Sequence, residues 1–189
     1  MSMPSGLKKL FIALLLALSV LSPAAGFCEE ARIDDVKVSW TPSLNASFEV
    51  KDAFTKDIDE AIKSGMPTSF NFIIELERVN SVWFDELVGR WEFKHTVKYD
   101  TLKEEYEVLL DETGDKGVRT KDMNEMKTLM ATGTSVAVTP AHLVPGAEYE
   151  LKIKAELRTT ELPFILNYML FFVKIWDFKT DWYSYSFRP

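Results

Sequence analysis

The sequence contains little of what motif-defined enzymes use. Cys28 is its single cysteine, so no intramolecular disulfide can form and the fold must depend on an apolar core. Its two histidines, His95 and His142, have no second histidine or cysteine at the spacing of a zinc site. No HExxH, GxSxG or Gly-rich phosphate loop is present. The sequence therefore predicts no catalytic residue, no metal site and no cofactor.

Basic residues are also in deficit. The chain has 22 Lys and Arg against 29 Asp and Glu, which gives a formal net charge of -7 at pH 7. An acidic surface repels phosphate backbones, so we expect no nucleic-acid partner. Apolar residues make up 47% of the chain and aromatic residues 13%, which excludes an intrinsically disordered protein.

A long membrane-spanning run is missing, but a short apolar run lies near the N-terminus. Lys8 and Lys9 precede residues 10–21, in which only Ser19 is polar, and the helix-breaking, small-residue segment 23–26 follows. A transmembrane helix needs about 20 apolar residues, and this run is shorter. The order of charged, apolar and small segments predicts a signal peptide over residues 1–28.

Cleavage of this segment is expected between Gly26 and Glu30, which would release the protein into the periplasm. The alternative is an uncleaved segment, which would anchor the protein in the inner membrane. Lipidation of Cys28 is not expected, because the bulky Phe27 precedes it where lipoproteins carry a small residue.

Residues 29–189 are predicted to form a single domain of β-sandwich type. Apolar and polar residues alternate with period two in several segments, which is typical of half-buried antiparallel strands. These segments are 35–40, 70–77, 91–99, 106–110 and 148–158. The fold class expected is mainly β with two short helices, arranged as an antiparallel immunoglobulin/fibronectin-like β-sandwich.

A turn before the last of these segments supports that fold class. Leu143, Pro145 and Gly146 precede Tyr149, which begins an alternating strand. This order resembles the tyrosine corner of fibronectin-type sandwiches, in which the tyrosine hydroxyl hydrogen-bonds back to the main chain. We therefore expect the Tyr149 hydroxyl to pair with the backbone.

Two segments have helical periodicity instead. In the first, apolar residues from Phe54 to Ile62 share one face, with Asp52 as the expected N-cap and Gly65 as the stop. In the second, methionines recur at helical spacing around 121–131, and we expect this helix to be entered from Thr120 and closed by Gly133. Methionine at this spacing is typical of core filling.

Two polar features are candidates for functional sites. His95 lies on the apolar face of its strand, and we interpret it as a hydrogen-bonded core or rim residue. Residues 111–117 carry oxygen side chains at alternate positions, as a calcium loop does. The ligand set is incomplete, however, because Lys116 replaces the turning glycine, and a hairpin turn is the prediction here.

The candidate interaction surface lies in residues 162–176, an apolar and aromatic stretch interrupted only by Asn167 and Lys174. Such runs are usually core, but a domain of this size has limited room for so many large side chains. Part of the stretch is therefore expected at the surface, in contact with a partner or a membrane. The candidate residues are Phe164, Tyr168, Phe171, Phe172 and Trp176.

The pattern as a whole resembles an uncharacterised family of exported bacterial proteins, the domain-of-unknown-function family 4390. The resemblance implies a periplasm-facing protein that serves as a signalling accessory, and it brings no functional residues with it. The pieces that carry it are Ala61 to Gly65, Phe70 to Phe72, Glu75 to Arg78, Trp83, Val97 to Asp100 with Leu102 and Tyr106, Leu162-Pro163, Trp176 and Asp181 to Tyr183.

Together these features favour a non-enzymatic periplasmic binding module, accessory to a membrane sensor or envelope protein. One alternative is a periplasmic enzyme without a recognisable motif, which would need two convergent carboxylates in a pocket. The other is a protein attached to the membrane surface through residues 162–176. The expected partner is a membrane or envelope protein, with peripheral membrane contact as the variant.

Overall fold

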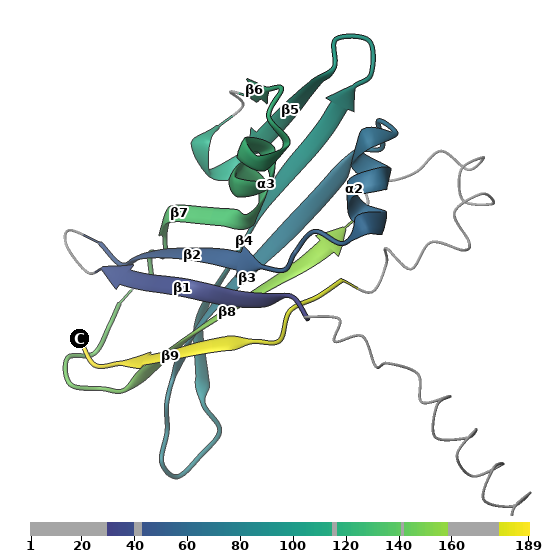
Figure 1. Cartoon of the computed structure of the whole chain (residues 1–189). Coiled ribbons are helices and arrows are strands. Elements are labelled where there is room, and N and C mark those ends of the chain that lie inside the picture. The colour runs from purple at the N-terminus through teal and green to yellow at the C-terminus, as the bar shows by residue number, and fades with distance from the viewer. Residues whose placement is uncertain (1–29, 40–42, 115–116, 141, 159–177) are drawn as a thin grey trace, which may run out of the picture.

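The computed structural model describes residues 30–39, 43–114, 117–140, 142–158 and 178–189. These residues form two antiparallel sheets and two α-helices (Figure 1). The smaller sheet has the order β1-β2-β7, with β1 Arg32–Ser39, β2 Asn45–Lys51 and β7 Thr132–Ala137. The larger sheet has the order β6-β5-β4-β3-β8-β9, with β3 Thr68–Arg78, β4 Glu86–Asp100, β5 Glu105–Leu110, β6 Val118–Thr120, β8 Tyr149–Arg158 and β9 Tyr183–Phe187.

The prediction of a mainly β, antiparallel fold with two helices is confirmed. Each segment with period-two alternation overlaps a strand of the structure, in β1, β3, β4, β5 or β8, and Trp40 of the first segment lies outside the described residues. Alternation places one side of each strand in the core, and the buried residues of β5 and β8 alternate with more exposed ones. The helices are α2 Lys56–Lys63 and α3 Met123–Ala131, and a short 3-10 turn, η1, covers Asp111–Thr113.

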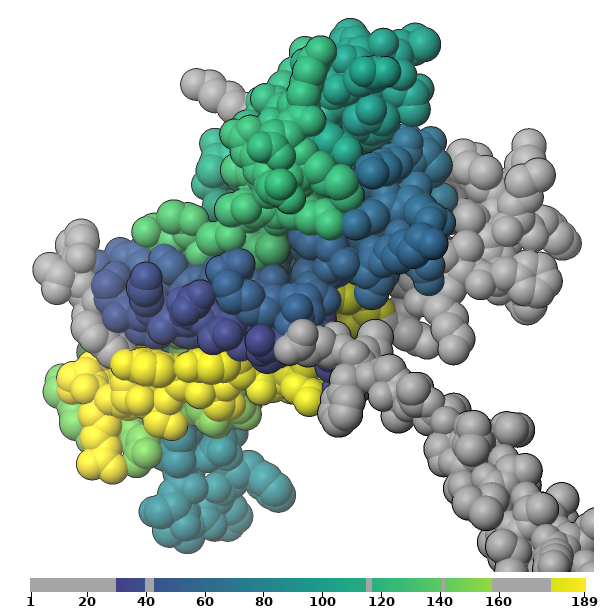
Figure 2. Space-filling model, viewed as in Figure 1, coloured from purple at the N-terminus to yellow at the C-terminus, as the bar shows by residue number. Residues whose placement is uncertain are grey.

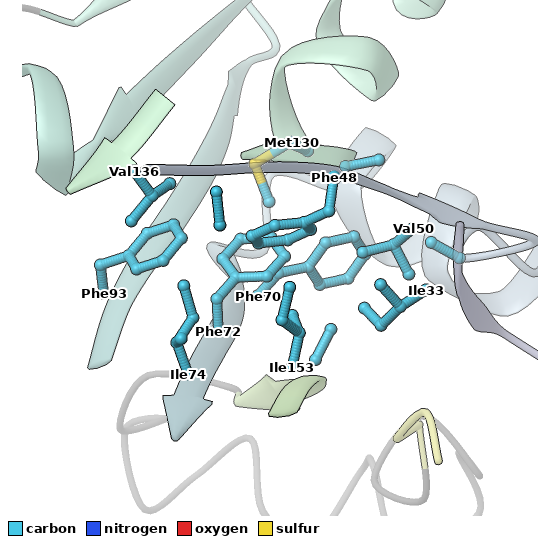
Figure 3. Packing of buried hydrophobic residues seen from close by; sticks show 14 of the residues in the cluster. Ile33, Phe48, Val50, Phe70, Phe72, Ile74, Phe93, Met130, Val136 and Ile153 are labelled. Carbon is cyan, nitrogen blue, oxygen red and sulfur yellow. The ribbon is translucent and has the colours of Figure 1, made fainter. Parts of the chain in front are cut away.

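The core lies between the two sheets and centres on aromatic rings (Figure 3). The ring of Phe72 on β3 lies 5.4 Å from that of Phe48 on β2 and 5.0 Å from that of Phe93 on β4, centroid to centroid. Aromatic pairs at these distances stabilise a core beyond the area they bury. Phe72 therefore joins the small sheet to the large one.

Gly133 permits this contact. It lies in β7 opposite Phe48, and a Cβ at this position would come within 2.6 Å of the Phe48 ring. The prediction that Gly133 closes the second helix is wrong, because α3 ends at Ala131 and the chain enters β7 at Thr132 without a turn. The glycine leaves room for a ring instead of ending a helix.

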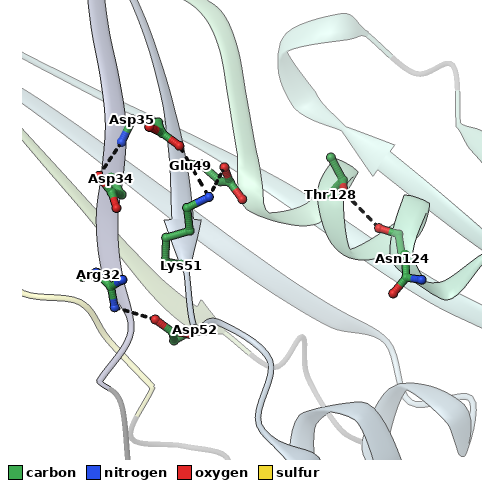
Figure 4. A network of polar contacts seen from close by, with 8 residues as sticks. All are labelled: Arg32, Asp34, Asp35, Glu49, Lys51, Asp52, Asn124 and Thr128. Carbon is green, nitrogen blue, oxygen red and sulfur yellow. Dashed lines mark hydrogen bonds and ion pairs between the residues drawn. The ribbon is translucent and has the colours of Figure 1, made fainter.

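The N-caps of the helices lie three residues after Asp52 and two residues after Thr120, where they were expected. Thr55 caps α2 by accepting a hydrogen bond from the Ile58 N–H, and Asp122 caps α3 in the same way for Asn124. Asp52, the predicted cap of the first helix, instead pairs with Arg32 at 2.5 Å (Figure 4). Gly65 does follow the helix end, with φ +84.

Methionines of α3 fill the core as predicted. Met126 and Met130 are completely buried. On the other side of the helix, Lys127 pairs with Asp59 of α2 at 2.7 Å and lies over the ring of Phe54. The two helices are therefore held to each other as well as to the sheets.

The backbone contact expected of Tyr149 is present. Its hydroxyl accepts a hydrogen bond of 2.9 Å from the backbone N–H of Val144, and the side chain is 1% exposed. The ring of Tyr149 also stacks on that of Phe187 of β9. This one side chain thus fixes the turn before β8 and the strand beside it.

We predict that Tyr149→Phe lowers the free energy of unfolding by about 0.5–1.5 kcal/mol, the net contribution of one hydrogen bond. Chemical denaturation of the wild type and the variant measures the change. Tyr185→Phe is the matched control, since in the described part of the chain its hydroxyl has no hydrogen-bond partner. Equal midpoints for wild type and Tyr149→Phe would contradict the assignment.

Candidate interaction site at the tip of the β3–β4 hairpin

The hairpin of β3 and β4 extends beyond the rest of the large sheet (Figures 1 and 2). Arg78 of β3 pairs with Glu86 of β4 and, on its other side, with Tyr149, the first residue of β8. β5 ends opposite His95. β5 therefore ends far from the tip, whereas β8 follows β3 to its last residue, and the Val79 backbone N–H donates to the Glu148 carbonyl oxygen at 2.9 Å. The tip, residues 79–87, lies beyond the strand pairing of β3 with β8.

Three consecutive large apolar side chains are exposed at this tip. Val82 and Trp83 are each 81% exposed, and Phe84 is 95% exposed. Leu87 and Val79, nearer the base, are partly exposed as well. Large apolar side chains that gather in one exposed patch are typical of interaction sites.

Hydrogen bonds within the loop hold its main chain. The Asn80 backbone N–H donates to Asp85 Oδ1 at 2.9 Å, and the Asn80 side-chain amide donates to the carbonyl oxygen of Phe84 at 3.1 Å. The two residues close the loop around positions 81–84. The main chain that carries the apolar residues is thereby fixed at both ends of the loop.

The basic residues near the tip are all engaged by carboxylates. Arg78 pairs with Glu86, and Lys152 of β8 lies 2.5 Å from Glu77. The hydrogen bond that Lys152 donates to Glu77 raises the pKa of Lys152, against the opposing effect of burial. These cations neutralise acids of the hairpin itself.

Arg90, farther along β4, is held in the same way. Its guanidinium lies 2.7 Å from Glu92 and 2.5 Å from Glu75. The hydrogen bonds that Arg90 donates to Glu92 are the main cause of the raised pKa of Arg90. Asp85, in contrast, forms no ion pair with any Lys or Arg in the described part of the chain.

The residues predicted from sequence as an interaction surface are not part of this site. Residues 162–176 lie outside the described residues, and the prediction for them stays a prediction. They are Phe164, Tyr168, Phe171, Phe172 and Trp176.

Sequence reasoning missed the tip, although the sequence contains a signal for it. Between two strands with alternating patterns there is a run of three apolar residues, Val82, Trp83 and Phe84. Polar pairs, Asn80-Ser81 and Asp85-Glu86, flank this run. A run of apolar residues at a turn, where polar residues are expected, indicates a functional surface. Of these three residues, only Trp83 is among the pieces that carry the family resemblance.

His95 is completely buried and hydrogen-bonded, as predicted. Its Nδ1 lies 3.2 Å from the carbonyl oxygen of Met130, and its Nε2 lies 2.7 Å from Glu112 Oε1. Both ring nitrogens are therefore engaged, one by the end of α3 and the other by η1.

The carboxyl of Glu112 reflects this pairing. Burial acts to raise its pKa, but the hydrogen bond and the charge of His95 outweigh burial, and the pKa of Glu112 is lowered. The pair joins η1 to β4. The contact of His95 with the Met130 carbonyl oxygen also joins the end of α3 to β4. The complete burial of His95 indicates a structural role for the pair.

The other polar features are engaged in local structure. The turn predicted at 111–117 begins with η1, and Asp111 Oδ2 accepts a hydrogen bond of 3.1 Å from the Lys94 backbone N–H. His142 is exposed. In the described part of the chain, no three His, Cys, Asp or Glu side chains gather as a metal site would require.

A hollow of about 460 Å³ lies between the end of α2 and the β4–β5 turn. Its lining includes the carboxylates of Asp100 and Glu107, and each of them is already bound by other groups of the protein. Backbone N–H groups of Lys103 and Leu102 donate to Asp100 and lower its pKa, while Glu107 pairs with Arg119 at 2.8 Å. A lowered pKa at Asp100 is the opposite of what a general acid at neutral pH requires.

Comparison with known proteins gives one result. A family model described as Domain of unknown function (DUF4390) matches residues 30–186, most of the chain. The match confirms the resemblance inferred from the sequence. No curated protein and no solved structure matches the chain. Among the described residues, no helix is long and apolar enough to cross a membrane.

We predict that Glu112→Gln destabilises the protein in a pH-dependent way. The lowered pKa of Glu112 adds stability above the ordinary value of 4.5, and this contribution is lost as pH falls through the pKa of the folded state. At pH 7 the loss should be about 1 kcal/mol, the difference between a charged and a neutral hydrogen bond.

Thermal or urea unfolding from pH 7 down to pH 3 measures this difference. Wild type and variant should converge at the acid end. Glu60→Gln is the control, because Glu60 is exposed on α2 and should change stability by less than about 0.5 kcal/mol. A difference between wild type and Glu112→Gln that stays constant with pH would contradict the role given to the carboxylate.

Proposed function

The chain belongs to the family of the domain of unknown function DUF4390, and we propose that it is an exported, non-enzymatic binding module that docks through the β3–β4 tip. The observation that carries the proposal is the exposure of Val82, Trp83 and Phe84 on a projecting hairpin. The receptor is a component of the cell envelope. Export follows from the signal peptide expected at residues 1–28.

The composition of the tip supports binding. Tryptophan and other aromatic residues are enriched at the centres of protein interfaces, where each buries a large apolar area. The Asn80–Asp85 contacts fix the loop before binding, which lowers the entropy lost on association. The core does not depend on these exposed side chains, so they are available to contact a partner.

Two finer proposals accompany this function. The Tyr149 contact supports an immunoglobulin/fibronectin-like arrangement of the two facing sheets. Residues 162–176 are proposed as a second contact surface, on the composition of the sequence alone.

We predict that replacing Trp83 and Phe84 by serine weakens envelope association at least about tenfold, as expected for central aromatic contacts. Purified protein is mixed with envelopes from cells that lack it, and the bound fraction is measured by co-sedimentation. The fold should persist, because these side chains are almost fully exposed and support little of the core.

Leu102→Ser is the matched control. Leu102 is as exposed as Phe84, at 95%, but it lies in the β4–β5 turn at the opposite end of β4. It should bind like the wild type. Equal binding by wild type and by the Trp83→Ser, Phe84→Ser variant would overturn the proposal.

Export is tested separately. N-terminal sequencing of protein recovered from the periplasm should show a mature chain that begins between Phe27 and Glu30. A chain that still begins at Met1 would contradict cleavage. It would then favour the alternative of an inner-membrane anchor.

A further inference from the structure

We infer that the tip of the β3–β4 hairpin is recognised by a protein with an apolar pocket and a basic rim, and not by a lipid bilayer. The inference rests on the proposed function and adds the chemistry of the partner. Shape alone does not separate the two receptors, because a convex aromatic tip enters a protein pocket or a membrane interface equally well. Charge separates them.

The tip carries acids without a compensating base. Residues 79–87 include Asp85 and Glu86 but no Lys or Arg. Glu86 is paired with Arg78, whereas Asp85 has one carboxylate oxygen on the Asn80 backbone N–H and its other oxygen open to solvent. The net charge presented beside the aromatic residues is therefore negative.

The cations behind the tip do not change this. Arg78, Arg90 and Lys152 each contact a carboxylate, and Arg90 and Lys152 each contact two. None of the three is left to meet a phosphate headgroup. Proteins that bind anionic membrane surfaces place unpaired Lys and Arg beside their inserted residues.

A protein receptor fits the same pattern. An apolar pocket takes up Val82, Trp83 and Phe84, and a Lys or Arg at its edge meets Asp85. Charges at the edge of an interface act mainly on the rate of association and on its dependence on salt. Asp85 is thus the residue of this tip that selects a basic partner surface.

The first experiment uses vesicles of phosphatidylethanolamine and phosphatidylglycerol in a three-to-one ratio, about the composition needed for an anionic surface. Wild-type protein and the Trp83→Ser, Phe84→Ser variant should both stay in the supernatant after sedimentation. Vesicle binding by the wild type that the double variant loses would overturn the inference in favour of the membrane.

The second experiment places a photoreactive phenylalanine at Val82 in protein that is mixed with envelopes and irradiated. Mass spectrometry should map the cross-link to a peptide of one protein, with Lys or Arg close to the linked position. Asp85→Asn keeps the oxygen that holds Asn80 and removes the charge. It should lower the cross-linking rate about threefold and make it less sensitive to salt.

The outcomes separate this inference from the proposed function. If the double serine variant loses envelope association but the cross-link goes to lipid, or Asp85→Asn has no effect, the function stands and the basic protein partner is wrong. If the double variant binds envelopes like the wild type, the function itself fails. Leu102→Ser should match the wild type in every assay.

Discussion

The contact of Phe72 with the facing sheet is the interaction on which the rest of the fold depends. β3 lies between β4 and β8 in the large sheet, and the Phe72 ring meets Phe48 of the small sheet and Phe93 of its own. Truncating such a ring would cost several kcal/mol, because the surroundings cannot fill the cavity. With no disulfide available to the chain, this aromatic centre has to hold the two sheets together.

That anchoring explains how the hairpin can project. The part of β3 nearest the core is paired on both sides, so its register with β4 is fixed before the chain reaches the tip. The Asn80–Asp85 contacts then fix the loop itself. Exposed aromatic residues on an unsupported loop would collapse onto the protein, whereas here the two strands hold them away from it.

The sequence analysis assigned β1, β3, β4, β5 and β8 from their alternating pattern. It missed β2 and β9, although buried and more exposed residues alternate in both. β6 has only three residues and β7 contains glycine and threonine, so neither has a clear pattern. The Tyr149 contact was predictable because its partner lies five residues away. The partner of His95 was not predictable from sequence, because Glu112 comes close to His95 only through the register of β4 with β5.

His95 and Asp85 have opposite relations to solvent, and this keeps binding separate from folding. His95 of β4 is completely buried, and its contact with Glu112 of η1 outweighs burial and lowers the pKa of that carboxyl. Asp85, directly before β4, is exposed beside side chains that support little of the core. A substitution at the His95–Glu112 contact therefore acts on stability, whereas a substitution at the tip acts on the proposed binding. A tip that is almost independent of the core can vary to suit a receptor while β3 and β4 keep the residues that the fold requires.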